Sequence, residues 1–302
     1  MRRREPQGLR RCRFDILHTP ASAERIGPRR DGGTILIARL ALAAIAVLAC
    51  AMPACAMEQV SFPSRDGTVL TGWIAKPAGS GPFPAVVALH GCSGLWRASG
   101  GLSARESDWS ARLVAAGFLV LLPDSFRPRG IVALCNDRER ALRPADRASD
   151  ALGAADWLAR QPFAKPAGIH LIGWSNGGST ALHVAADRAA AGPGGFRAII
   201  AFYPGCRVLL KRGWRARVPT TILQGLADDW TPAAPCEELA RRGGARFVGF
   251  AGAYHDFDHP DLPLRERGAA YSQRPDGKVT IGTDAAARAQ AISDVMAILR
   301  AP

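Results

Sequence analysis

Residues 169–178 read Ile-His-Leu-Ile-Gly-Trp-Ser-Asn-Gly-Gly, a strand-like apolar run followed by a glycine-flanked serine. A segment of helical composition follows from Gly177 to Ala190, so the serine stands between a predicted strand and a predicted helix. Small residues two positions before and after it allow a sharp turn that projects the hydroxyl beyond the strand end. The positive end of the helix favours an anion there. We predict that Ser175 is a nucleophile; the alternative is a Gly-Ser loop that merely opens a helix.

Apolar segments of strand length alternate with segments of helical periodicity along the rest of the chain. We expect strands at residues 60–62, 69–75, 85–89, 118–122, 169–172, 198–202, 220–223 and 247–250, the last of them being the final strand. We expect helices at residues 104–116, 144–160, 177–190, 233–241 and 285–299. Such alternation predicts the α/β class, with a mostly parallel sheet, helices on both faces and an antiparallel start at the first two strands.

A serine hydroxyl needs a base to become a nucleophile at neutral pH, and two histidines in one loop are candidates. His255 and His259 both follow the strand predicted at 247–250, and His255 comes first, where the strand end would bring it over the serine. We therefore assign the base to His255 and keep His259 as the alternative. The other histidines are interpreted as structural or as lying in the N-terminal segment: His18, His90, His170 and His183.

The base in turn needs a carboxylate that holds its tautomer. Asp228 and Asp229 lie in the loop after the strand predicted at 220–223, at the same sheet edge as the serine. We choose Asp228 as the orienting acid and interpret Asp229 as a possible cap of the following turn. The resulting chain order is Ser175, Asp228, His255, the order found in α/β-hydrolases.

With these motifs identified, residues from about 58 to 300 resemble the dienelactone hydrolase family of α/β-hydrolases. The resemblance rests on His90-Gly91-Cys92-Ser93-Gly94, Pro123-Asp124-Ser125-Phe126, Gly173-Trp174-Ser175-Asn176-Gly177-Gly178, Gly225-Leu226-Ala227-Asp228 and Tyr254-His255-Asp256-Phe257. It implies an α/β-hydrolase fold, a cysteine or serine nucleophile at position 175, the acid at 228 and the base at 255. The best-known members carry cysteine at the nucleophile, so the serine here favours a broader esterase over a dienelactone-specific enzyme.

An oxyanion hole of two backbone N–H groups is expected beside the nucleophile. One would come from Asn176, and the resemblance points to Cys92 for the other; a Cys92 nucleophile is the less favoured alternative. Arg127 and Arg129, in the long loop 124–143, are candidates for binding a substrate carboxylate, against the alternative that both are exposed loop residues.

Four of the seven cysteines lie after residue 57, and an even number in an exported protein predicts disulfides. Four cysteines allow three pairings. We predict Cys92–Cys135, because both follow strands that should be neighbours, and Cys206–Cys236, because both lie near consecutive strands. No cysteine or histidine spacing appropriate to zinc is present, and we expect neither a metal site nor a cofactor.

The N-terminus has the pattern of a targeting segment. Basic residues precede an apolar run from Thr34 to Met52, and Ala54-Cys55-Ala56 provides small residues for signal-peptidase cleavage near Ala56. We expect residues 1–56 to be an N-terminal extension with a signal peptide, residues 57–302 to be one domain, and the mature protein to be periplasmic or secreted. An uncleaved membrane anchor is the rival interpretation, and a lipoprotein cysteine at Cys50 a weaker one.

Charge argues against nucleic-acid binding. The formal net charge of the chain is +13. Residues 1–56 hold 10 Lys and Arg against 4 Asp and Glu, a net charge of +6, so residues 57–302 carry a net charge of +7. The remaining arginines are scattered rather than grouped with aromatic residues, as a nucleic-acid surface would require. The expected partner is a small molecule.

The motifs together predict hydrolysis of a small carboxylic ester or lactone through an acyl-enzyme. A serine peptidase of the same fold and a catalytically silent binding protein are the alternatives. Only 52 residues separate Ser175 from Asp228, which leaves little chain for a lid. We therefore expect an open, partly cationic cleft that disfavours long acyl chains.

Overall fold

The computed structural model describes residues 57–192 and 194–301. The apolar run 34–52, the expected cleavage near Ala56 and the cysteines before it lie outside these residues, so those expectations have no structural counterpart. Within the described residues, no helix combines the length and the apolar character that crossing a bilayer requires.

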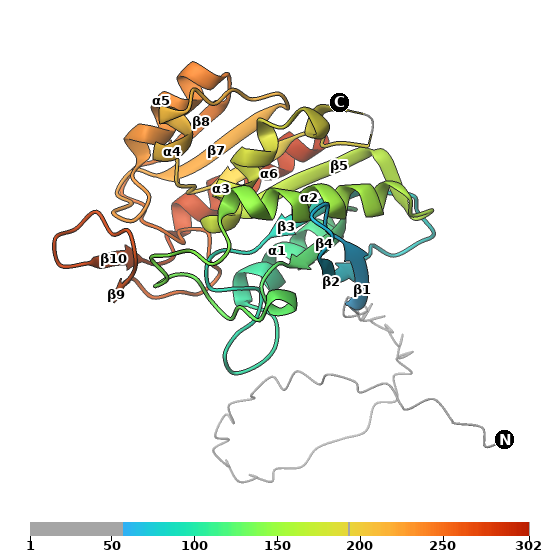
Figure 1. The fold of residues 1–302 in the computed structure, drawn as a ribbon, viewed down its shortest axis with the longest axis horizontal. Helices are drawn as coiled ribbons and strands as arrows, with labels where there is room; N and C mark the ends of the chain where they lie inside the picture. The colour runs from blue at the N-terminus through green and yellow to red at the C-terminus, as the bar shows by residue number, and fades with distance from the viewer. Residues whose placement is uncertain (1–56, 193, 302) are drawn as a thin grey trace, which may run out of the picture. The chain divides into compact units, whose positions relative to one another are not determined.

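An eight-stranded sheet forms the centre of the fold, in the order β1-β2-β4-β3-β5-β6-β7-β8 (Figure 1). Its strands are β1 (Glu58–Pro63), β2 (Val69–Ala75), β3 (Phe83–Leu89), β4 (Leu119–Asp124), β5 (Ala164–Trp174), β6 (Ile199–Phe202), β7 (Thr220–Gly225) and β8 (Arg246–Phe250). β1 and β2 pair antiparallel, as do β2 and β4, whereas every neighbouring pair from β4 across to β8 is parallel. The predicted α/β fold with its antiparallel start is confirmed.

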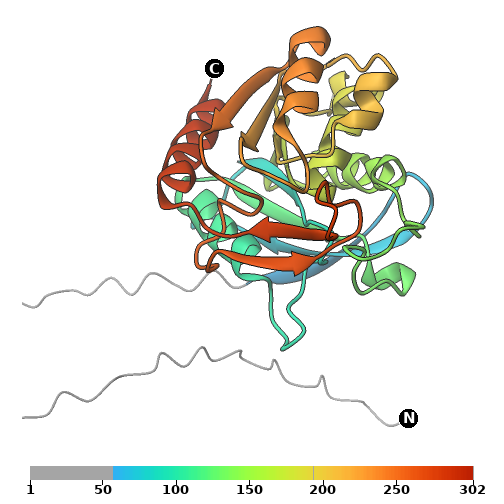
Figure 2. The same cartoon turned by 90° about the vertical axis from the view of Figure 1, so that its left-hand side faces the viewer.

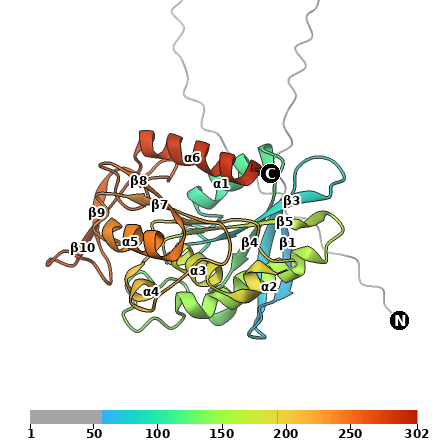
Figure 3. The same cartoon turned by 90° about the horizontal axis from the view of Figure 1, so that it is seen from above.

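Helices cover both faces of this sheet, as predicted. They are α1 (Ala104–Ala115), α2 (Pro144–Ala159), α3 (Asn176–Ala185), α4 (Arg207–Lys211), α5 (Ala233–Gly243) and α6 (Ala285–Arg300), with short 3-10 turns η1 (Arg127–Arg129) and η2 (Arg188–Ala191). Seen from above, α1 and α6 lie on one face, and α2 to α5 lie on the other (Figure 3).

The apolar core of the sheet is correspondingly split into two large clusters, one on each face, and a third, small cluster of Phe126, Leu134 and Leu142 lies in the long loop after β4. Along β3, Val87 packs into the cluster with α2, α3 and α5, whereas its neighbour Val86 packs into the cluster with α1 and α6. Successive side chains of a strand point to opposite faces, so a central strand covered on both sides must be apolar throughout. That is why the continuous run 85–89 predicts a buried parallel strand correctly.

The prediction that the strand at 247–250 is the final one is wrong. A two-stranded antiparallel hairpin of β9 (Arg265–Gly268) and β10 (Lys278–Ile281) follows β8 (Figure 2). β9 reads Arg-Glu-Arg-Gly and is mostly exposed, so it carries no apolar alternation to reveal it. Helix α3 also ends earlier than predicted, because the Asp187 side chain accepts the Ala189 N–H and starts the separate turn η2.

Both predicted disulfides are present. Cys92 is bonded to Cys135, and Cys206 is bonded to Cys236. The first joins the loop after β3 to the long loop after β4, and the second joins the start of α4 to α5.

Candidate active site

Ser175 occupies a strained turn between β5 and α3. Its φ is 54° and its ψ is −110°, values that a residue with a side chain rarely adopts. A Cβ added to Gly173 would come 2.2 Å from the carbonyl oxygen of Gly177, and a Cβ added to Gly177 would come 2.2 Å from that of Leu89. Only glycine therefore permits the close approach of strand and helix that turns the Ser175 hydroxyl outwards.

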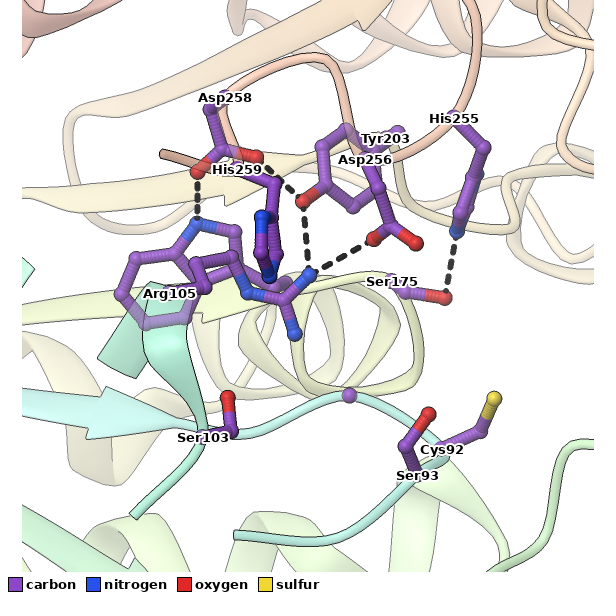
Figure 4. A network of polar contacts seen from close by, with 12 residues as sticks. Cys92, Ser93, Ser103, Arg105, Ser175, Tyr203, His255, Asp256, Asp258 and His259 are labelled. Atoms are coloured by element: carbon purple, nitrogen blue, oxygen red, sulfur yellow. Dashed lines mark hydrogen bonds and ion pairs between the residues drawn. The ribbon is translucent and has the colours of Figure 1, made fainter. Parts of the chain in front are cut away.

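Three predicted residues meet at this turn. His255 Nε2 lies 2.9 Å from Ser175 Oγ, and His255 Nδ1 lies 2.8 Å from Asp228 Oδ2. The histidine is fully buried, and Figure 4 shows its ring reaching down to Ser175 from the loop after β8. This order of contacts lets the histidine accept the serine proton at one nitrogen while the carboxylate holds the other.

The two neighbouring aspartates have different partners. Asp228 accepts the backbone N–H groups of Trp230 and Thr231, both at 2.9 Å, which aims its second oxygen at the histidine. Asp229 turns to β10, where it accepts the N–H of Thr280 at 2.7 Å and its hydroxyl at 2.9 Å. Asp229 therefore anchors the hairpin, a role different from the cap of the following turn that the sequence suggested.

The pKa of His255 is raised above its ordinary value of 6.5. Burial alone would lower it, but the charge of Asp228 and its hydrogen bond outweigh that effect. His259 lies in the same cleft, where its Nδ1 accepts the Asp261 N–H, and the contact with Ser175 is made by His255. His90 is buried against Phe126, and burial holds its pKa well below the usual range.

The N–H groups expected to form the oxyanion hole belong to α3 and to the loop after β3. Asn176 is the first residue of α3, so its N–H has no acceptor within the helix. Cys92 lines the cleft in the loop after β3, and its sulfur is engaged in the disulfide, which is incompatible with the alternative of a free Cys92 nucleophile. Buried Arg147 donates to the Asn176 side chain at 2.5 Å and to the His90 carbonyl at 3.1 Å. It therefore links the start of α3 to the loop after β3.

The two candidate arginines of the long loop have different positions: one lines the cleft and the other does not. Arg127 lines the cleft, with its guanidinium carbon 4.7 Å from the centre of the Trp96 ring. Arg129 points away: its guanidinium donates to both oxygens of Asp150, at 2.9 and 2.8 Å, and to Asp66. The expectation that Arg129 contacts substrate is therefore corrected, because its hydrogen-bonding capacity is used to hold the turn η1.

A buried polar network that the sequence did not indicate lies beside Ser175, His255 and Asp228 (Figure 4). Arg105 donates to the Tyr203 hydroxyl at 3.1 Å and to Asp256 at 2.7 Å. Asp256, directly after the base, has a left-handed φ of 62° that brings its carboxylate to this arginine. Burial alone would lower the pKa of Arg105, but the surrounding carboxylates, Glu106 first, raise it well above its ordinary value.

Asp258 closes the network and connects the base loop to the nucleophile turn. Its Oδ2 accepts the indole N–H groups of Trp109 and Trp174, both at 2.7 Å, and its Oδ1 accepts the Tyr203 hydroxyl at 2.5 Å. Trp174 directly precedes Ser175, and Asp258 follows the base by three residues. One carboxylate thus ties both catalytic segments together. The only signal in the sequence was the polar residues Asp256, Asp258 and His259 soon after His255. Their spacing alone did not indicate which partners they contact.

The cleft that contains these groups has a volume of about 1020 Å³. Two tryptophans, Trp96 and Trp230, lie on its walls, together with five arginines: Arg97, Arg105, Arg127, Arg265 and Arg267. Among the described residues, no set of three or more histidine, cysteine, aspartate or glutamate side chains is arranged to hold a metal ion.

Comparison with known proteins places this geometry in context. The family model described as dienelactone hydrolase family matches residues 70–301. No curated protein matches the chain. A solved structure of a dienelactone hydrolase-like promiscuous phosphotriesterase from metagenomic libraries is 21% identical, with a TM-score of 0.59, and the match covers 81% of this chain and 97% of that one.

Two further structures share the fold. Thermogutta terrifontis esterase 2, solved phosphorylated by paraoxon, is 18% identical with a TM-score of 0.55, over 79% of this chain and 91% of its own. A puromycin-hydrolyzing peptidase of Mycobacterium tuberculosis is 15% identical with a TM-score of 0.56, over 80% of this chain but 38% of its own. At these identities the likeness shows the fold alone.

The raised pKa of His255 predicts where activity is lost on acidification. Nε2 must be unprotonated to accept the Ser175 proton, so we expect activity above the pKa and a loss as the pH falls through it. The acidic limb of kcat/KM for a neutral ester should therefore lie above pH 6.5. Asp228→Asn removes the carboxylate that raises this pKa, so the limb should move to lower pH while kcat falls on the order of 10⁴-fold.

Asp229→Asn is the matched control, since it alters the hairpin anchor and leaves the contact with the histidine. The acidic limb of its kcat/KM profile should lie at the same pH as that of the parent. A limb that does not move in Asp228→Asn, or a larger loss of rate in Asp229→Asn, would contradict the assignment of the acid.

Asp258→Asn tests the connection between the base loop and the nucleophile turn. The amide keeps the shape but has one acceptor oxygen for three donors, so we expect kcat to fall about tenfold with little change in KM. Asp261→Asn, an exposed neighbour in the same loop, should leave both constants unchanged. Thermal unfolding of each variant monitors stability separately, and a rise in KM at constant kcat would contradict a positioning role.

Proposed function

This chain belongs to the dienelactone hydrolase family, and we propose that it is an exported serine hydrolase of small carboxylic esters or lactones. The hydrogen-bonded series Ser175, His255 and Asp228 supports this proposal most directly. It provides a nucleophile, a base within reach of the nucleophile's proton and an acid that orients the base.

In the proposed mechanism, His255 Nε2 takes the Ser175 proton as Oγ attacks the ester carbonyl. The N–H groups of Asn176 and Cys92 stabilise the oxygen that becomes negative. His255 then gives its proton to the leaving alcohol, and the acyl group remains on Ser175. Water attacks this acyl-enzyme with His255 as base again, which releases the acid and restores the serine.

The cleft favours small and polar substrates. The Arg127 side chain is 59% exposed, its guanidinium lies over the Trp96 ring, and its Nε is 4.0 Å from Asp124 Oδ2. Its two terminal nitrogens remain for a carboxylate on the acyl side. A long acyl chain would gain about 0.8 kcal/mol for each CH₂ it buries, which requires an extended apolar channel. Apolar residues line much of the cleft, but five arginines interrupt them, which reduces the continuous apolar surface that such a chain needs.

Export is part of the same proposal. Two disulfides are typical of proteins that fold in an oxidising compartment. The apolar run 34–52 and the Ala54-Cys55-Ala56 motif provide the pattern of a cleaved signal peptide. The proposed partner is a small-molecule ester or lactone, with no nucleic-acid partner.

A chain-length series tests the substrate class. We expect kcat/KM for p-nitrophenyl esters to be highest for short acyl chains and to decline from butyrate to laurate, with no turnover in Ser175→Ala. Matched aminoacyl amides should be poor substrates, which separates an esterase from a peptidase. A specificity constant that climbs steadily to laurate, or amides that react as fast as esters, would contradict the proposal.

A further inference from the structure

The hairpin β9–β10 forms a fixed wall of the cleft. Asp229 anchors β10 through Thr280, and the Trp230 indole donates to the Ala270 carbonyl at 3.0 Å. The base loop contributes as well, since the His255 carbonyl accepts the Gly282 N–H at 3.0 Å and His255 bridges to Ile281. The hairpin is therefore tied to the loops of both the acid and the base.

Strand β9 presents two arginines to the cleft. Side chains alternate along a strand, so Arg265 and Arg267 share one face and Glu266 takes the other. Arg265 and Arg267 line the cavity with Ser175, whereas Glu266 pairs with Arg274 and Lys278. The two positive residues thus line the cavity that contains the catalytic serine, and the negative residue pairs outside it.

These two arginines have no carboxylate partner among the described residues, although acidic side chains line the same cleft. Asp124 accepts two backbone N–H groups and an indole N–H, and Asp137 accepts backbone N–H groups of its own loop. Asp256 is paired with a buried arginine. Arg267 Nε donates to the Gly268 carbonyl at 3.4 Å, and the terminal nitrogens of both guanidinium groups are therefore available to an anion that enters the cleft.

The catalytic chemistry indicates which part of a substrate would meet them. The leaving alcohol must lie beside His255, because that histidine gives it a proton. Trp230 packs against His255, with ring centres 4.7 Å apart, and the Arg267 guanidinium lies 5.8 Å from the centre of the Trp230 ring. The hairpin wall therefore borders the leaving-group side of the nucleophile.

The sheet order puts Arg127 on the other side. Arg127 follows β4, which lies beyond β3 on one side of β5, whereas Trp230 follows β7, on the opposite side of β5. Ser175 at the end of β5 thus stands between an arginine stacked on Trp96 and an arginine beside Trp230.

We propose that Arg267, with Arg265, forms a second anion subsite that binds a carboxylate on the alcohol part of the ester. The substrate class is then an ester whose alcohol is a hydroxy acid, including esters that carry a carboxylate on each side of the scissile bond. This inference rests on the proposed ester hydrolysis and adds the leaving-group specificity. A guanidinium offers a carboxylate two parallel hydrogen bonds, which fixes its orientation as well as its charge.

Four esters with the same number of carbon atoms test this subsite: ethyl butyrate, monoethyl succinate, O-butyrylglycolate and O-succinylglycolate. A carboxylate replaces a terminal methyl on the acyl part, on the alcohol part or on both. For each enzyme the measured quantity is the ratio of kcat/KM for a glycolate ester to that for its ethyl counterpart. Comparing this ratio between variants and the parent cancels the greater intrinsic reactivity of glycolate esters.

We expect Arg267→Ala to lower the glycolate-to-ethyl ratio on the order of tenfold, with a smaller decrease in Arg265→Ala. Arg127→Ala should instead lower the succinate-to-butyrate ratio. Arg188→Ala removes the same charge from an exposed residue outside the cleft, and both ratios should match the parent. Added salt should reduce the glycolate preference of the parent, because the arginines on β9 are partly exposed to solvent.

The outcomes separate the inference from the proposed function. If the parent hydrolyses the esters but Arg267→Ala and Arg265→Ala keep its glycolate-to-ethyl ratio, the subsite is wrong and ester hydrolysis stands. An equal decrease in Arg188→Ala would likewise overturn the subsite, because net charge would then explain the preference. If the parent hydrolyses none of the four esters, the proposed function itself is overturned.

Discussion

The close approach of β5 and α3 is the constraint on which the catalytic arrangement depends. Gly173 and Gly177 leave no room for a Cβ, and the chain can turn there only if Ser175 takes a left-handed φ. Such backbone strain costs on the order of 1–3 kcal/mol and persists only where surrounding packing imposes it. Here the two buried apolar clusters hold the strand and the helix in place. The packing energy of the sheet therefore offsets the backbone strain at Ser175.

Everything else in the site is arranged around that turn by the ends of parallel strands. The loop after β3 brings Cys92, the loop after β7 brings Asp228, and the loop after β8 brings His255 to the same edge. Long-range contacts then restrict how far these loops can move. The Cys92–Cys135 disulfide ties the first to the long loop after β4, and Asp258 ties the last to the residue before Ser175.

The sequence was informative where the signal was local. A glycine-flanked serine between strand and helix predicted the turn, and the parallel order predicted that Asp228 and His255 would meet it. The hairpin was missed because Arg265 and Glu266 show no apolar pattern, and its stability comes from Asp229 and Trp230, distant in the chain. Arg129 was misplaced for a related reason, since its carboxylate partners, Asp66 and Asp150, are identified only by the fold.

The central claim is that Ser175 is a nucleophile activated by His255, and covalent labelling tests it most directly. The parent protein should react with a fluorophosphonate to give a single adduct, which peptide mass spectrometry locates at Ser175. His255→Ala should be labelled far more slowly and Ser175→Ala not at all, with each protein shown to be folded. A folded parent that takes up no label, or a label that persists in Ser175→Ala, would contradict the account.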